Sequence, residues 1–193
     1  MDNVVAFDDY VHATYPSVAD QALAHYGVSS PEEAKPGLDH LFHDMWIAGP
    51  VRTLARHHAR TSSPVWLYHF TLVPPTQMGE WLGSRHAAEI TYVFGNLLDQ
   101  SSQPAGSPPN PMNVDDWTDV DRQASAAMMN AWTQFAAPGN PKGDGLVQWP
   151  ECDGADQHLT FGDPVEVGTG LHTAGVELYD AYQTERRRMD RSQ

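Results

Sequence analysis

Residues 64–72 read PVWLYHFTL, and this stretch is the strongest strand signal in the chain. It is rich in β-branched and aromatic residues and is apolar almost without interruption. A strand with one wet face alternates between polar and apolar residues, whereas a strand covered on both faces is continuously apolar. We therefore predict a core-type strand over about 64–72, in a sheet of the α/β class.

The segment before this strand has helical patterning over about its first 60 residues. Ser30, Pro31 and Glu33 have the order of a capping box, with proline at the first helical position. One apolar stripe at helical spacing follows: Leu38, Leu41, Phe42, Met45 and Trp46. We expect Gly49-Pro50 to break or bend this helix.

The segment after the strand mixes loops with shorter elements. Residues 73–88 are predicted to be a loop, and residues 89–95 fit a short helix or a strand equally well. Residues 100–114, QSSQPAGSPPNPMNV, have the composition of a surface loop. Either Asp115 or Asp116 could cap the helix that follows.

That helix should end at Pro138-Gly139, because proline and glycine commonly terminate helices. Residues 158–161 and 164–167 are predicted to be short strands joined by a turn. Residues 172–188 form an amphipathic C-terminal helix that ends in three arginines, where cations suit the helix dipole.

Composition narrows the class of protein. The 193 residues have a net charge of −14, which repels phosphate, so we expect neither a nucleic-acid partner nor an anionic membrane partner. No apolar run is long enough to span a bilayer, and residues 1–10 have no signal-peptide pattern. Cys152 is the single cysteine, so no internal disulfide is expected. The sequence does not indicate the cellular compartment.

Histidine is abundant, with ten residues. His40 and His43 could share a helix face, but a metal site there would need a third ligand that the sequence does not indicate. His86 follows the predicted strand and a loop, and a mobile loop histidine can take a proton from a hydroxyl and return it. By spacing alone, an ordinary loop histidine is the more common interpretation of His86.

Residues 81–95, WLGSRHAAEITYVFG, resemble the catalytic-histidine block of type-B carboxylesterases and cholinesterases, which has the form W-x-G-x-x-H-x-x-E-I-x-Y/F-V-F-G. Four further blocks are similar to the same family, in the same order along the chain: residues 42–46 with Pro50, residues 64–70, residues 131–136 with 139–141, and residues 149–150 with 159–161. The resemblance covers almost the whole chain and implies the C-terminal portion of an α/β-hydrolase fold.

The resemblance also implies roles for individual residues. His86 would be the triad histidine of an acyl-serine mechanism, first general base and then general acid, acting on a carboxylic ester of modest size. Glu89 would be a structural carboxylate, and Asp44 matches a structural helix position. This chemistry needs no cofactor and no metal.

The nucleophile is missing from this chain. No G-x-S-x-G elbow and no HGGG-like oxyanion loop occur in it, and the acidic triad member of the family would precede Met1. We therefore expect a missing N-terminal portion or chain as a partner, and an inactive chain in isolation. Without that partner, the strand at 64–72 would lack its parallel neighbour and remain an orphaned or edge strand. The alternative function is a non-catalytic, cholinesterase-like interaction module.

Overall fold

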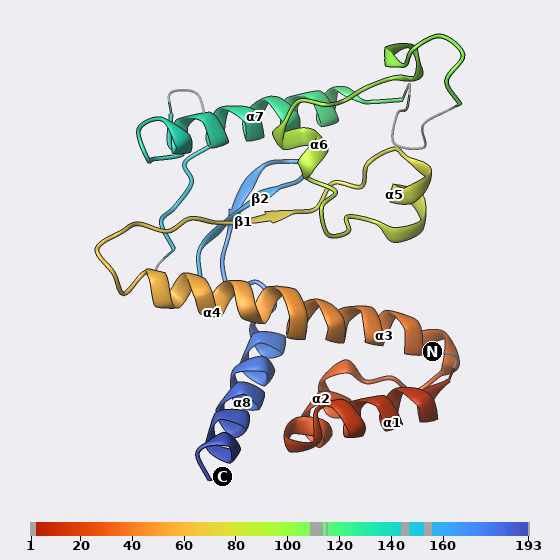
Figure 1. Cartoon of the computed structure of the whole chain (residues 1–193), viewed down its shortest axis with the longest axis vertical. Helices are drawn as coiled ribbons and strands as arrows, with labels where there is room; N and C mark the ends of the chain where they lie inside the picture. The colour runs from red at the N-terminus through yellow and green to blue at the C-terminus, as the bar shows by residue number, and fades with distance from the viewer. Residues whose placement is uncertain (1–2, 109–113, 115, 144–146, 153–155, 193) are drawn as a thin grey trace. The chain divides into compact units, whose positions relative to one another are not determined.

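The computed structural model describes residues 3–108, 114, 116–143, 147–152 and 156–192, and it contains two compact units (Figure 1). The helical unit comprises the described parts of residues 1–65, 153–156 and 170–193. The sheet unit comprises the described parts of residues 66–152 and 157–169. Each unit has a hydrophobic core of its own.

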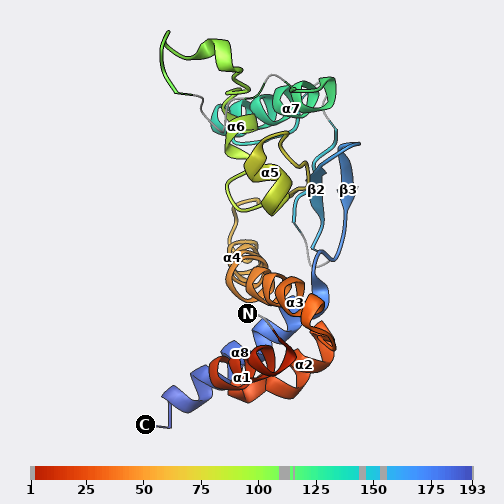
Figure 2. The ribbon, with the colours of Figure 1, turned by 90° about the vertical axis from the view of Figure 1, so that its right-hand side faces the viewer.

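The helical unit confirms the helical reading of the first 60 residues. Its helices are α1 Val4–Thr14, α2 Ala19–Tyr26, α3 Pro31–His43, α4 Gly49–His58 and α8 Thr173–Asp190, with a 3-10 turn η1 at Pro16–Val18 and a π-helical turn η2 at Asp44–Ala48. Figure 2 shows α1, α2, α3 and α8 grouped within this unit. They pack around fully buried Phe7 and Val11, together with Leu41 from α3 and Leu178 from α8.

Helix α3 begins as predicted, but the interruption expected at Gly49-Pro50 is not seen as a break. The Glu33 carboxylate accepts hydrogen bonds from the backbone N–H groups of Ser29 and Ser30, at 2.8 and 3.1 Å, which completes the capping box. The backbone then stays helical through Gly49-Pro50, so the helix does not break there; instead it is distorted directly before Gly49 by the π turn η2. The π turn η2 lies directly before Gly49-Pro50, and both proline and π turns interrupt the regular hydrogen bonding of an α-helix.

The sheet unit contains a mixed three-stranded sheet in the order β1-β2-β3. Strand β1, Leu67–Phe70, pairs in parallel with β2, His158–Phe161, and β3, Glu166–Gly168, pairs antiparallel with β2. The strand prediction at 64–72 is thus confirmed in its centre, and the two short late strands form.

Two details of the strand prediction are corrected. Strand β1 has a parallel neighbour within this chain, β2, so it is an edge strand of the described sheet and not an orphan. It is also shorter than predicted, because its ladder extends only as far as the four residues of β2. Of its own residues only Phe70 is buried, so β1 is not covered on both faces.

Helix α7, Asp119–Ala136, packs on the sheet through buried Ala124, Met128 and Ala131. It begins at Thr118, whose hydroxyl accepts from the backbone of Asp121 at 3.2 Å, so the cap is not Asp116. Thr118 is the cap because the Asp121 carboxylate accepts in return from its backbone N–H, at 2.8 Å. The other predicted cap, Asp115, lies outside the described residues. The helix ends before Pro138, as predicted.

The remaining segments are short. The predicted loop at 73–88 contains a helix, α5 Gln77–Leu82, and the ambiguous stretch at 89–95 forms helix α6, Ile90–Val93. The Pro/Ser-rich stretch holds one 3-10 turn, Gln100–Ser102, and its residues 109–113 lie outside the described residues. None of the helices described here combines the length and apolar character that crossing a membrane requires. The helix-rich architecture with a small sheet confirms the α/β class.

Candidate active-site histidine loop

The candidate site is the histidine loop, defined as residues 83–89 between α5 and α6. Thr76 caps α5 by accepting a hydrogen bond from the backbone N–H of Gly79, at 2.9 Å. Gly83 ends that helix with a φ of +64°, which glycine adopts without strain. The Ser84 hydroxyl then donates to the carbonyl of Phe70, the last residue of β1, at 2.9 Å. The loop is therefore fixed at the carboxyl end of β1.

His86 is exposed at the surface of this loop. The residue after it, Ala87, has a φ of +70°, in the left-handed region that non-glycine residues rarely adopt. Within the described part of the chain, no side chain forms a hydrogen bond with the His86 imidazole.

Glu89 lies at the other end of the loop and contacts the sheet. The Tyr68 hydroxyl donates to its Oε1 at 3.4 Å. Burial raises the pKa of Tyr68 to about 12, and the negative charge of Glu89 adds to the effect. Tyr68 therefore remains a protonated donor at neutral pH. No hydrogen bond between described groups joins Glu89 to the His86 imidazole, and the bond from Tyr68 ties Glu89 to β1 instead.

Apolar side chains flank the loop, and they face outward. Trp81 is 72% exposed and Phe94 is 69% exposed, with Leu82 and Ile90 also exposed. Large aromatic side chains are usually buried, so the exposure of Trp81 and Phe94 is unusual. The space beneath the loop, lined by Thr76, Arg85 and Trp117 among others, measures about 10 Å³, which is room for no more than a water molecule.

Asp44, predicted to be structural, belongs to the helical unit and is buried there. The Tyr26 hydroxyl donates to its Oδ2 at 3.1 Å, and Nδ1 of His172 lies 2.8 Å from its Oδ1. His43 completes a group whose potential ligand atoms all lie within 4.8 Å of one another, while His40 is exposed and not part of it.

The sequence prediction paired His43 with His40 and missed His172. Burial lowers the pKa of His43, and the nearby His172 lowers it further. His172 stands far along the chain, at the start of α8, so no local spacing could indicate it. His172 precedes the first residue of α8 and has a left-handed φ of +52°. Only the folded chain shows that this residue lies beside His43.

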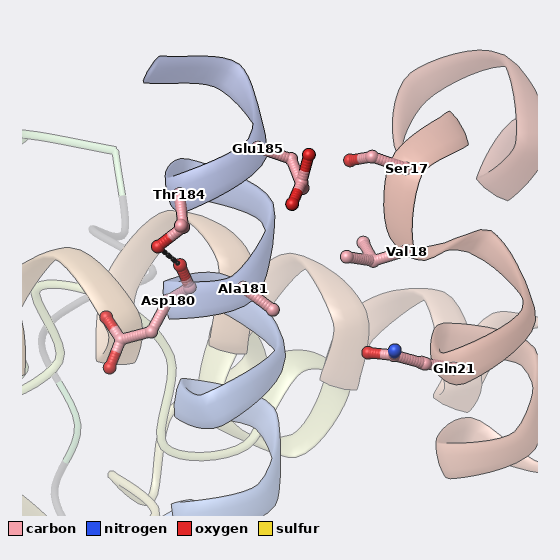
Figure 3. A pocket seen from close by; sticks show the side chains of 7 residues that line it. All are labelled: Ser17, Val18, Gln21, Asp180, Ala181, Thr184 and Glu185. Carbon is pink, nitrogen blue, oxygen red and sulfur yellow. Dashed lines mark hydrogen bonds between the residues drawn. The ribbon is translucent and has the colours of Figure 1, made fainter. Parts of the chain in front are cut away.

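A separate cavity of about 450 Å³ lies in the helical unit, between the η1–α2 segment and α8 (Figure 3). Polar groups from both sides line it, including Ser17, Gln21 and Glu185. The Thr184 hydroxyl on its wall donates to the backbone carbonyl of Asp180, at 2.8 Å. The cavity contains no histidine, so it has no proton acceptor of the type that the histidine loop offers.

Comparison with known proteins decides the family. The model of the Carboxylesterase family matches residues 2–179, which include the histidine loop. The chain belongs to the carboxylesterase family. The α/β-hydrolase fold of this family agrees with the α/β architecture described above.

Individual carboxylesterases are similar to this chain. Carboxylesterase 3 of Pongo abelii is 33% identical over 170 residues, and carboxylesterase 3 of Homo sapiens is 29% identical over 170 residues; each match covers 85% of this chain and 28% of the relative. Fumonisin B1 esterase of Sphingopyxis macrogoltabida is 27% identical over 168 residues, covering 87% of this chain and 30% of the relative. The chain thus spans less than a third of the relatives it matches.

Proposed function

We propose that residues 1–193 are the C-terminal portion of a serine carboxylic-ester hydrolase and supply its triad histidine, His86. The observation that carries the proposal is the placement of this residue: an exposed imidazole in a loop bonded to the carboxyl end of a parallel strand. Ligands of open α/β sheets bind outside the carboxyl ends of the strands. The motif at 81–95 and the family membership support the same role.

In this mechanism His86 accepts the proton of a serine hydroxyl as its oxygen bonds to the ester carbonyl carbon. The imidazolium then returns the proton to the departing alcohol, and the acyl-serine is hydrolysed by water that His86 activates. The serine, the acidic partner of His86 and the oxyanion hole would come from outside this chain. Glu89 and Tyr68 hold the far end of the loop.

The exposed apolar side chains of Trp81 and Phe94 suggest that another part of the enzyme covers them beside the histidine loop. Large contiguous apolar side chains rarely remain in water without a partner, and these two flank the proposed catalytic residue. In the proposed enzyme the remaining portion of the hydrolase covers them, which encloses the ester and excludes water around His86.

The test begins with the coding DNA upstream of Met1. If an in-frame extension encodes G-x-S-x-G, the extended protein should hydrolyse p-nitrophenyl acetate, and His86→Ala should lower kcat by at least about 1,000-fold. The exposed His12→Ala is the matched control and should leave kcat unchanged. An extended enzyme that keeps its activity after His86→Ala would refute the role of His86.

The second candidate is a non-catalytic interaction module, which the outward-facing Trp81 and Phe94 also favour. It predicts that the chain folds stably alone and binds a partner through this face. Absence of any upstream G-x-S-x-G reading frame, together with partner binding abolished by Trp81→Ala but retained in His86→Ala, would decide for this alternative.

A further inference from the structure

Three potential metal ligands converge in the helical unit, and none of them is used in the proposed hydrolysis. His43 ends α3, Asp44 begins the π turn η2, and His172 caps the start of α8. Their candidate ligand atoms lie within 4.8 Å of one another, and the two imidazole rings have centroids 4.5 Å apart. Ligands around a tetrahedral zinc ion are about 3.4 Å apart, so small side-chain rotations would close the three onto an ion.

The contact between Asp44 and His172 is short but is not aligned as a hydrogen bond. Nδ1 of His172 lies 2.8 Å from Oδ1 of Asp44. Yet this buried oxygen accepts no hydrogen bond from the groups that the structure describes, so the short contact lacks hydrogen-bond alignment. A carboxylate that is 3% exposed needs a positive partner, and a cation between the two atoms would supply it.

The surroundings hold these ligands in place. The Tyr26 hydroxyl donates to Oδ2 of Asp44, which leaves Oδ1 directed at the histidines, as hydrogen-bond partners of metal-binding carboxylates do. Burial raises the pKa of Tyr26, so it remains a donor. Gly175 lets α8 pass against Asp44, because a Cβ at this position would overlap the carboxylate. His172 takes its left-handed φ of +52° at the same place.

We propose that His43, Asp44 and His172 bind a divalent transition-metal ion of the zinc type. Two imidazole nitrogens and one carboxylate oxygen are borderline ligands that suit Zn²⁺ or Co²⁺ and give Ca²⁺ and Mg²⁺ too few oxygens. Three protein ligands leave at least one coordination position for water or another small ligand. The site links α3, η2 and α8 within the helical unit and does not depend on the role of His86.

The test is titration of the tag-free full chain with Co²⁺, followed by visible absorption. We expect d–d bands of low-coordinate cobalt that saturate at one equivalent and disappear when Zn²⁺ is added. His172→Gly removes a ligand and suits the left-handed backbone, so this variant should fold and bind Co²⁺ about 100-fold more weakly or worse. His43→Gln should have the same effect, and Tyr26→Phe should weaken binding about tenfold.

The matched control is His40→Ala, which removes an exposed histidine from the same helix, one turn away. It should bind Co²⁺ as the native chain does. Circular dichroism at equal protein concentration separates loss of ligand from loss of fold. Equal Co²⁺ binding in native, His172→Gly and His43→Gln chains, or no saturable binding by the folded native chain, would overturn the proposal and leave a plain Asp44–His172 ion pair.

Discussion

At the scale of the residue, single hydrogen bonds hold the elements around the histidine loop. Tyr92 of the 81–95 motif is fully buried, and its hydroxyl donates to Oδ1 of Asp121 at 2.7 Å. Its backbone carbonyl accepts from the hydroxyl of Ser125, at 2.8 Å. Helix α6 is only four residues long, so these bonds to α7 secure it more than its own backbone does.

We predict that Tyr92→Phe lowers the free energy of unfolding of the sheet unit by about 1.5–3 kcal/mol, because the buried Asp121 carboxylate loses a donor. Tyr68→Phe is the matched control: its hydroxyl makes a longer bond and its side chain is partly exposed, so a smaller loss is expected. Urea unfolding followed by tryptophan fluorescence measures both. Equal losses in the two variants would contradict the importance given to the Tyr92–Asp121 bond.

At the scale of the element, features set by neighbouring residues could be predicted from the sequence. Features that depend on a distant segment could not. The capping box at Ser30 and Glu33 lies within four residues, so the sequence contains it completely. The length of β1 depends on β2, which is distant in sequence, and the helix through Pro50 follows a π turn that no residue pattern announced. Thr118 displaced Asp116 as a cap because of its reciprocal bonds with Asp121.

The two candidate sites also differ in whether the sequence could indicate them. His86 was found because its loop motif is contiguous in sequence, although its role as triad histidine stays a prediction. The cluster of His43, Asp44 and His172 needs α8 to return to the π turn, and the nearest sequence signal, the spacing of His40 and His43, includes His43 but gives no indication of His172. Contacts between distant segments form only in the folded chain, so spacing alone could not reveal them.

Helix α4 and helix α8 approach closely at Gly49, where an added Cβ would overlap the ring of Tyr179. We predict that Gly49→Ala destabilises the helical unit by about 1–3 kcal/mol through overpacking, even though alanine favours a helix. Val51→Ala, an exposed substitution on the same helix, is the control and should change stability by less than about 1 kcal/mol. Thermal unfolding followed by far-UV circular dichroism measures both, and a stabilised Gly49→Ala chain would contradict the close approach.

At the scale of the whole molecule, the described residues form two units, and the sequence contains one of the three triad residues that the proposed mechanism needs. The chain has two cores and a sheet, and it belongs to a family of esterases, yet it covers about 28% of the length of the relatives named above. The triad acts as a unit, and a histidine without its nucleophile is an ordinary weak base.

We predict that the purified 193-residue chain hydrolyses p-nitrophenyl acetate no faster than its own His86→Ala variant. The reason is the absence of G-x-S-x-G from the sequence, which removes most of the rate acceleration. Initial rates corrected for spontaneous hydrolysis check this expectation. Turnover by the native chain that disappears in the variant would show that another nucleophile in the chain replaces the serine.

The edge position of β1 also has a consequence for how a split hydrolase could be assembled. Within the described sheet, β1 is bonded to β2 on one side, and the carbonyls of Leu67 and Phe70 also accept hydrogen bonds from the side chains of Trp149 and Ser84. A further strand beside β1 would have to replace or extend these bonds. A boundary that crosses a sheet between two neighbouring strands cuts a single ladder of hydrogen bonds. If the proposed hydrolase is formed from two separate chains, mixing them should restore activity at a rate that depends on both concentrations.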